Sequence, residues 1–463
     1  MRKMAGLALM IGAALAAGCN SNNDSTTPDP SARNVIFFLG DGMGLNTLTA
    51  ARIYGVGEEG SLTIDTLPET AFIKTFSHDA QVTDSAPSMA AYMTGVKSNN
   101  GVISMDGDAT YESDCSKSAG KPVTTLLELA KADGRGTGVV TSTRVTHATP
   151  AATYAHICNR DLENDIAVQL VPGGTGYNGA LKEGLDVVLG GGSGFFLPKA
   201  DKGKREDGRN LISEMQAKGY QFASNLSELN KAEAGKPLLG LFGSSHMKYE
   251  LDRPADEPSL AQMTLAAIKQ LKDKEKGYFL MVEGGRIDHA LHDTNAKRAL
   301  QDTLAFDNAI KAAIDEVKKT DPELKNTLIV VTADHDHTLV LNGYAKRTGK
   351  TTTGNPGVLG LVKNYQTGEP SKDADGMPYT IIGFGNGYNR VDGPRSSVAP
   401  LDDATVSAND YHQEVVVKVG DIGNETHGGT DVFLGAIGQG ADSFHGSLDN
   451  TAVFGKVKAA AKL

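Results

Sequence analysis

Cysteine and long apolar runs are scarce in this 463-residue chain, and an excess of positive charge is missing. Three cysteines are too few for a cysteine-based zinc finger. Acidic residues outnumber basic ones 56 to 45, for a net charge of −11, so nonspecific binding to nucleic-acid phosphates is disfavoured and we expect no nucleic-acid partner. The hydrophobic content of 40% is instead normal for a globular protein with a sizeable core.

The first 19 residues have the pattern of an export signal. Two basic residues precede an apolar run from Ala5 to Ala17, which is too short to span a membrane comfortably. The ending LAAGC resembles a bacterial lipoprotein signal, in which Cys19 becomes the lipidated first residue; ordinary secretory cleavage nearby is the alternative. Both interpretations predict an exported protein, either periplasmic or membrane-anchored through Cys19. Residues 20–33 are polar and contain proline, which predicts a flexible tether.

The other two cysteines are Cys115 and Cys158. An oxidising compartment would permit a disulfide between them, but sequence does not show whether their Cα atoms are close enough. The sequence leaves their pairing open.

Short, continuous apolar runs alternate with amphipathic stretches along residues 34–463. Continuous runs are typical of strands that are buried on both faces. The chain therefore predicts a single α/β domain with a doubly wound, mostly parallel central sheet flanked by helices. The predicted strands cover residues 35–39, 138–141, 186–189, 237–242, 277–282, 327–332 and 432–437.

Residues 343–426 differ from the rest of this domain. They are rich in glycine, proline and asparagine and have weak periodicity. We expect a largely irregular insertion between the last two core strands, either a lid or a lobe that faces a dimer partner.

Carboxylates and imidazoles gather where predicted strands end. Ligands of open parallel sheets bind at the carboxyl ends of the strands, because the loops converge there. Strand 35–39 is followed by Asp41, strand 277–282 by EGGRIDHALH, and strand 327–332 by ADHDH, while ETHGG precedes strand 432–437. So many charges in one small space would be costly unless a cation balances them. This mixture of oxygen and nitrogen ligands suits zinc, and oxygen alone suits magnesium.

Two local patterns add to the metal hypothesis. Asp288 and His292 are four residues apart, so they share one face of a helix and can reach the same ion. Asp84 and Ser85 stand just before a predicted helix. Ser85 could simply be the N-cap, but at a helix N-terminus beside metal ions it is also a fair candidate for a nucleophile.

Six motifs together resemble the alkaline phosphatase family, in the order found in those enzymes. The resemblance spans roughly residues 34–440. The motifs are LGDGMG, TDSAPSMAAYMTG, TRVTHATPAATYAH followed by Asn159-Arg160, VEGGRIDHALH, TADHDH and THGGTD. The resemblance implies a phosphomonoesterase with two zinc ions, one magnesium ion and a phosphoserine intermediate, and it also implies a homodimer.

The resemblance further implies a role for individual residues. Ser85 would be the nucleophile, and Arg160 would hold the phosphoryl oxygens. Asp84 would set the turn before Ser85, and His147 would act on magnesium through a bound water. His289 and His337 receive no ligand role. The first zinc would be held by Asp288, His292 and His427, the second by Asp41, Ser85, Asp334 and His335, and the magnesium by Asp41, Thr149 and Glu283.

Two classes of alternative function remain open. Sulfatases and phosphodiesterases belong to the same superfamily, although the sulfatase pattern would need Arg where Met89 stands. A non-enzymatic lipoprotein that stores zinc or phosphate would need the metal ligands but not Ser85.

Overall fold

A ten-stranded sheet lies at the centre of residues 31–463, the part of the chain that the computed structural model describes. Its strand order is β15-β2-β14-β8-β1-β7-β3-β4-β6-β5. Only β14 pairs in the antiparallel sense, with β2 and β8, and the other pairs within this sheet are parallel. The strands are β1 (Asn34–Gly40), β2 (Glu69–Lys74), β3 (Gly136–Arg144), β4 (Val187–Gly191), β5 (Gln221–Ala223), β6 (Leu238–Leu241), β7 (Tyr278–Gly284), β8 (Thr327–Ala333), β14 (Val432–Gly438) and β15 (Gly446–Asp449).

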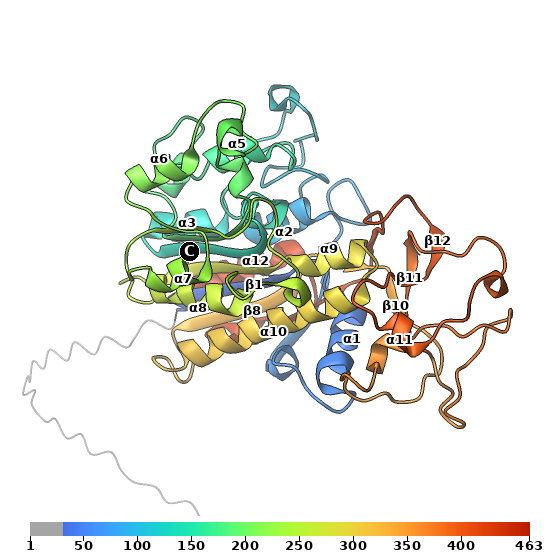
Figure 1. Ribbon diagram of the computed structural model, residues 1–463. Helices are drawn as coiled ribbons and strands as arrows, with labels where there is room; N and C mark the ends of the chain where they lie inside the picture. The colour runs from blue at the N-terminus through green and yellow to red at the C-terminus, as the bar shows by residue number, and fades with distance from the viewer. Residues whose placement is uncertain (1–30) are drawn as a thin grey trace, which may run out of the picture. The chain divides into compact units, whose positions relative to one another are not determined.

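Helices flank this sheet in two packed groups (Figure 1). Helix α10 packs against α1, α8 and α9, whereas α2 packs against α3, α4 and α12. The helices are α1 (Leu45–Val56), α2 (Ser85–Thr94), α3 (Leu126–Asp133), α4 (Ala148–Ala151), α5 (Glu163–Val168), α6 (Leu211–Ala217), α7 (Leu226–Lys231), α8 (Leu260–Leu271), α9 (Arg286–His292), α10 (Ala296–Val317), α11 (Asp403–Val406) and α12 (Asn450–Ala461). The predicted doubly wound, mostly parallel α/β fold is therefore confirmed.

The core of the sheet consists of the continuous apolar strands. Every residue of β7 and β8 is buried, and so are six of the seven residues of β1. Asp41 directly follows β1, Glu283 is the last residue but one of β7, and Asp334 directly follows β8. Because β1 pairs in parallel with both neighbours, these three carboxylates meet at one edge of the sheet.

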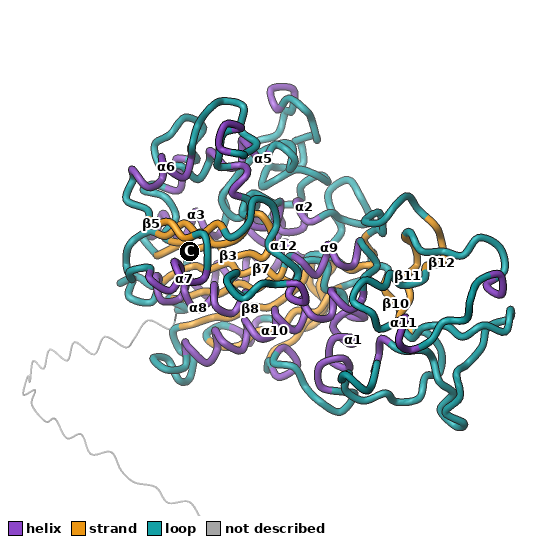
Figure 2. Tube along the Cα trace, viewed as in Figure 1, coloured by secondary structure: helices purple, strands orange, loops and turns teal. Residues whose placement is uncertain are grey.

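Residues 343–426 contain more order than the sequence indicates. Strands β11 (Ile382–Gly387) and β12 (Val415–Lys418) lie within this segment and form a separate three-stranded sheet with β10 (Leu339–Leu341), which precedes it, beside mostly irregular chain (Figure 2). Two further short strands, β9 (Asp336–His337) and β13 (His427–Gly428), pair with each other at the ends of this segment. That pairing places His337 opposite His427.

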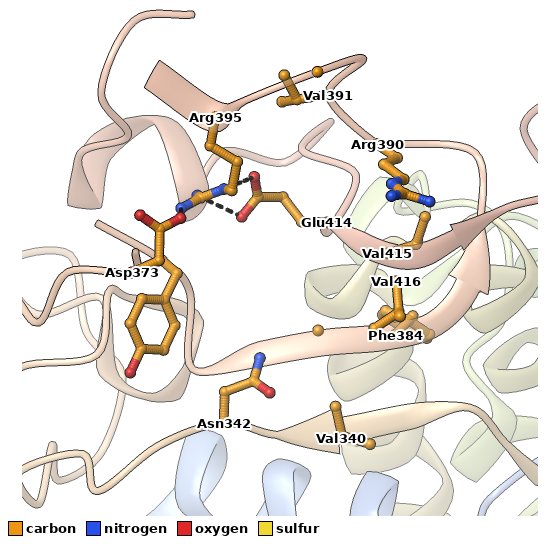
Figure 3. A pocket seen from close by; sticks show the side chains of 13 residues that line it. Val340, Asn342, Asp373, Phe384, Arg390, Val391, Arg395, Glu414, Val415 and Val416 are labelled. Atoms are coloured by element: carbon orange, nitrogen blue, oxygen red, sulfur yellow. Dashed lines mark hydrogen bonds and ion pairs between the residues drawn. The ribbon is translucent and has the colours of Figure 1, made fainter. Parts of the chain in front are cut away.

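A pocket of about 410 Å³ lies in this second sheet (Figure 3). Arg395 crosses it and forms ion pairs with Asp373, at 2.5 Å, and with Glu414, at 2.8 Å. The charged side chains that line it, Asp373, Arg390, Arg395 and Glu414, carry no net charge, so the pocket offers no excess of carboxylates to a cation.

The compact body begins earlier than the predicted tether boundary. Residues 31–33 were assigned to the tether, yet Ala32 is fully buried, and Arg135 Nη1 donates hydrogen bonds to the carbonyls of Ala32, at 2.9 Å, and Arg33, at 3.0 Å. The buried guanidinium therefore holds this segment against the body. The predicted export signal, Cys19 and the rest of the tether lie outside the described residues.

Two further findings bear on the sequence predictions. Cys115 and Cys158 form a disulfide, which settles the pairing that the sequence left open. Among the described residues, no helix is long and apolar enough to cross a bilayer.

Candidate metal centre and nucleophile

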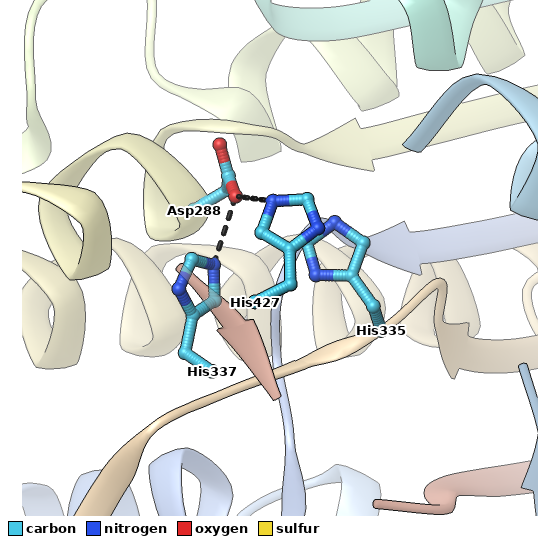
Figure 4. A group of neighbouring side chains, drawn as sticks. All are labelled: Asp288, His335, His337 and His427. Carbon is cyan, nitrogen blue, oxygen red and sulfur yellow. Dashed lines mark hydrogen bonds and ion pairs between the residues drawn. The ribbon is translucent and has the colours of Figure 1, made fainter. Parts of the chain in front are cut away.

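The first group of ligand-like side chains surrounds Asp288 (Figure 4). Asp288 Oδ1 lies 2.8 Å from His337 Nε2, 3.2 Å from His292 Nε2 and 3.5 Å from His427 Nε2. Asp288 and His292 both come from α9, as their spacing predicts, whereas His337 and His427 come from the paired strands β9 and β13. The carboxylate is therefore surrounded by imidazoles from three parts of the chain.

Ring orientations show that this group fits a cation. His427 Nδ1 faces the carbonyl of Thr83 at 2.8 Å, and His292 Nδ1 contacts the carbonyl of Glu425. Because a carbonyl only accepts hydrogen bonds, each Nδ1 carries a proton. In the neutral rings neither Nε2 atom then carries a proton. The two Nε2 atoms lie 3.2 Å apart, and their lone pairs point at each other and at the carboxylate of Asp288. A divalent ion would complete this arrangement.

The second group joins Ser85 to Asp41, Asp334 and His335. His335 Nε2 lies 3.2 Å from Asp41 Oδ1, 3.3 Å from Ser85 Oγ and 3.4 Å from Asp334 Oδ2. His335 Nδ1 faces the carbonyl of Asp336, so the free lone pair is again the one that points inward. Asp334 Oδ2 is buried and has no hydrogen-bond partner, which also fits an unfilled coordination position.

A third group lies on the other side of Asp41. Thr149 Oγ1 donates to Asp41 Oδ2 at 3.2 Å, and Glu283 and His147 each bring a ligand-type atom close to the same carboxylate. Glu283 Oε2 accepts hydrogen bonds from Thr141 and Thr143, whereas Glu283 Oε1 is buried without a partner. This group consists of oxygen donors and one imidazole.

Without metal ions, bound protons balance the negative charge of these buried carboxylates. Burial raises the pKa of Glu283 well above its usual value, and the nearby charge of Asp41 raises it further. Burial disfavours a charged His335, but the carboxylates of Asp334 and Asp41 outweigh it and raise the pKa of His335 to about 9. Binding of divalent ions would displace these protons, because metal ligands bind in their deprotonated form.

Helix α2 places Ser85 at the metal groups. The N-cap is Asp84, whose Oδ1 accepts from the backbone N–H of Ala86 at 2.7 Å, and Ser85 is the first helical residue. The possibility that Ser85 is the N-cap is thereby excluded. Ser85 is buried, and its Oγ lies 3.4 Å from Asp41 Oδ1. Free backbone N–H groups at a helix N-terminus favour negative charge there, which suits a nucleophilic alkoxide.

Arg160 lies near the N-terminus of α2, beside Asp84. Its Nη1 is 3.4 Å from Asp84 Oδ1, and its Nη2 is 3.0 Å from His147 Nε2. One-fifth of the side chain remains exposed, so the guanidinium can meet a ligand from solvent.

All residues of the predicted site therefore converge, and the structure adds others. His337 received no ligand role, yet its two ring nitrogens bridge Asp288 and Glu425, the latter at 2.6 Å. Its position two residues after His335 in TADHDH places both rings toward the same side of the chain, which was the available signal. Glu425 stands in the ETHGG stretch noted above, but that motif does not predict its contact with His337, which depends on the pairing of β9 with β13.

Three imidazoles also cluster next to the third group. His246 belongs to none of the motifs quoted above, and its ring centroid lies 4.2 Å from that of His289 and 5.4 Å from that of His147. Burial and the neighbouring charge of His289 lower the pKa of His246 far below its usual value. Burial also lowers the pKa of His289, to about 4, and that of His147, so all three rings are neutral near physiological pH.

Comparison with known proteins decides the family. The family model for alkaline phosphatase matches residues 32–463. The chain belongs to the alkaline phosphatase family. It is 38% identical over 449 residues to the tissue-nonspecific alkaline phosphatase of Gallus gallus, an alignment that covers 90% of this chain and 82% of that protein. It is also 38% identical over 463 residues to the membrane-bound alkaline phosphatase of Bombyx mori, covering 91% of this chain and 78% of that protein.

A solved structure supports the same assignment. Thermus thermophilus alkaline phosphatase superposes with a TM-score of 0.68 and 27% identity, covering 94% of this chain and 93% of that one. The alkaline phosphatase family is metal-dependent, and the three groups described above lie together as such chemistry requires.

Proposed function

We propose that this alkaline phosphatase hydrolyses phosphate monoesters to an alcohol and inorganic phosphate through a phosphoserine on Ser85. The observation that carries the proposal is the convergence of Ser85 Oγ, Asp41 and His335 within 3.4 Å of one another at the N-terminus of α2. A metal store has no use for a buried hydroxyl at that place.

Two zinc ions and one magnesium ion suit the donor atoms of the three groups. We assign the first zinc to Asp288, His292 and His427, and the second to Asp41, Ser85, Asp334 and His335. The magnesium then takes Asp41, Thr149 and Glu283, all oxygen donors. His147 is buried beside this oxygen group and acts on it through a bound water in our assignment.

The chemistry divides between the cations and the chain. When bound, the cations neutralise the phosphoryl oxygens and lower the pKa of the Ser85 hydroxyl. Ser85 Oγ then attacks phosphorus, the bond from phosphorus to the ester oxygen breaks, and the alcohol leaves. Water subsequently attacks the phosphoserine, which releases inorganic phosphate and restores the hydroxyl.

Arg160 fixes the orientation of the phosphoryl group. A guanidinium can donate two parallel hydrogen bonds to two phosphoryl oxygens, which supplies both charge and geometry. Asp84 and His147 hold the guanidinium next to Ser85 before the substrate arrives.

The test compares substrates and removes the nucleophile. With p-nitrophenyl phosphate at alkaline pH we expect hydrolysis, whereas bis-p-nitrophenyl phosphate and p-nitrophenyl sulfate should be much poorer substrates. Ser85→Ala should lower kcat by about 10³-fold or more, while the bound zinc and magnesium stay. A higher kcat/KM for the diester or the sulfate, or full turnover by Ser85→Ala, would reject the proposal.

We further propose that the protein is exported and lipidated at Cys19, with secretory cleavage near that residue as the alternative. Mass spectrometry of the mature N-terminus separates these two fates. The family resemblance also favours a homodimer, which the mass of the protein in solution tests.

A further inference from the structure

One long loop covers the segment that carries Arg160. The loop spans residues 99–124, between α2 and α3, and Arg160 itself lies in irregular chain between α4 and α5. The Arg160 backbone N–H donates to the carbonyl of Gly101 at 2.8 Å. Ile103 and Ile157 exchange two further backbone hydrogen bonds, at 2.9 and 3.1 Å. The loop therefore substitutes for the regular secondary structure that Arg160 lacks.

Side chains extend this contact on both sides of Arg160. Asn159 Nδ2 donates to the carbonyl of Glu112 at 3.1 Å, and Tyr111 Oη donates to Asp161 Oδ2 at 2.6 Å. Both partners come from the outer part of the loop, whose residues are mostly exposed to solvent. The Tyr111–Asp161 hydrogen bond is exposed to solvent and the Asn159–Glu112 bond is partly buried, and each contributes only modest stability by itself.

The Cys115–Cys158 disulfide joins the same two segments covalently. Cys158 precedes Arg160 by two residues and is fully buried. Between residues 110 and 120, Cys115 is the hydrophobic side chain that packs against the core, while Tyr111 is 49% exposed. Without the disulfide, this part of the loop would keep mainly polar contacts, of which only some are partly buried.

The loop also holds the partner of the guanidinium. The backbone N–H of Gly101 donates to Asp84 Oδ2, and Asp84 Oδ1 faces Arg160 Nη1 at 3.4 Å. The loop thus contacts both the backbone of Arg160 and the carboxylate that orients its side chain. A shift of the loop would move both ends of this pair relative to Ser85.

We propose that Cys115 and Cys158 are positioning residues for Arg160, and that opening their disulfide weakens phosphate binding without removing the metal ions or the nucleophile. The inference rests on the proposed role of Arg160 in holding the phosphoryl group. The metal groups themselves are built from β1, β7, β8, α2, α4, α9 and the β9–β13 pair, and neither Cys115 nor Cys158 belongs to any of these elements.

Opening the disulfide is a two-electron reduction. A phosphine reductant attacks one sulfur atom and the sulfur–sulfur bond breaks. Water then supplies oxygen to the phosphorus, so that the products are a phosphine oxide and two cysteine thiols. The phosphine serves here as a laboratory reductant.

The experiment uses the full, metal-loaded protein and its Cys115→Ser/Cys158→Ser double variant. We expect the inhibition constant for inorganic phosphate to rise roughly five- to twentyfold, because a charge-assisted hydrogen-bond donor loses its fixed orientation. Zinc and magnesium per chain should not change. Ser113→Ala, an exposed change on the same loop, is the matched control and should leave the phosphate constant as it is.

A double-mutant cycle separates positioning from a general structural effect. In an Arg160→Ala background, removal of both cysteines should have almost no further effect on the phosphate constant, because the group they orient is already gone. An equal rise in both backgrounds would overturn the inference. An unchanged phosphate constant in a folded, metal-loaded double variant would overturn it as well.

Different results would reject the proposed role of Arg160 and the inference about the disulfide. If Arg160→Ala alone leaves phosphate inhibition unchanged, the proposed role of Arg160 is wrong. If only the cysteine variant has no effect, the role of Arg160 stands and the inference about the disulfide falls. Should the cysteine variant not fold, the folded native protein is reduced with the phosphine and its thiols are alkylated; the same comparison of phosphate constants, with the reductant-treated Ser113→Ala protein alongside, then decides.

Discussion

His337 illustrates, at the scale of single residues, how this metal centre depends on side chains beyond the ligands. Its Nε2 holds Asp288 at 2.8 Å, and its Nδ1 is fixed by Glu425 at 2.6 Å. The charge of Glu425 and the hydrogen bond to Asp288 outweigh burial and raise the pKa of His337 well above its usual value. The ring is thereby kept as a donor that orients the carboxylate toward the proposed first zinc.

We predict that His337→Ala weakens zinc binding by about 10- to 100-fold, because outer partners of metal ligands commonly contribute that much affinity. Competition against a chelator of known affinity measures the change. His445→Ala removes an exposed imidazole that faces only the carbonyl of Asp442, and should bind zinc as the native protein does. Equal zinc affinity of His337→Ala and the native protein would contradict the role that we give to this ring.

The sequence predicted the proposed metal ligands better than the side chains that hold those ligands in place. Asp288 and His292 follow from helical spacing, and Asp41 and Asp334 from their place after buried strands. The contact of Glu425 with His337 and that of His246 with His289 could not be found in this way, because each joins segments far apart in the chain.

At the scale of elements, α2 shows how a cap can serve both the fold and the site. Asp84 caps the helix through Ala86 N and also faces Arg160. We predict that Asp84→Ala lowers the free energy of unfolding by about 1 kcal/mol, whereas Asp84→Asn, which keeps the capping oxygen, changes it far less. Urea unfolding of the metal-loaded proteins measures this difference. Equal losses in the two variants would indicate that the charge, and not the cap, stabilises the helix.

Glu128 of helix α3 and His156, which lies in irregular chain between α4 and α5, form a pair whose contribution to stability depends on pH. His156 Nε2 lies 2.8 Å from Glu128 Oε1, and Glu128 Oε2 accepts from the N-cap backbone of Thr125 at 2.9 Å. Burial opposes both charges. The hydrogen bond and the attraction nevertheless raise the pKa of His156 above its ordinary 6.5 and lower the pKa of Glu128 below its ordinary 4.5.

The two pKa shifts determine how the stability contributions of His156 and Glu128 vary with pH. The His156 contribution is fully present below pH 6.5 and is lost as pH rises through the raised folded pKa. The Glu128 contribution is present above pH 4.5 and is lost as pH falls through the lowered folded pKa. We therefore predict that the stability lost in His156→Gln is largest near pH 5 to 6, and shrinks toward pH 9. Thermal melting of both proteins across this range measures it, and a loss that does not vary with pH would contradict the prediction.

For the whole molecule, the apolar pattern of the sequence was enough for the fold class but not for the full sheet. All seven predicted runs form strands, because each is continuous and buried. Strands β5 and β15 are too short to carry a period, and β2 alternates between buried and exposed residues as an antiparallel partner of β14. The small sheet of β10, β11 and β12 was missed for a related reason, since two long irregular stretches separate its strands.

The proposed activity depends on divalent ions that balance the carboxylates and imidazoles around Ser85. Its most direct test measures metal per chain together with phosphomonoesterase activity of the purified mature protein. We predict two zinc ions and one magnesium ion per chain, loss of activity when they are chelated, and recovery when both metals return together. Full activity after exhaustive chelation, with no metal left on the protein, would contradict it.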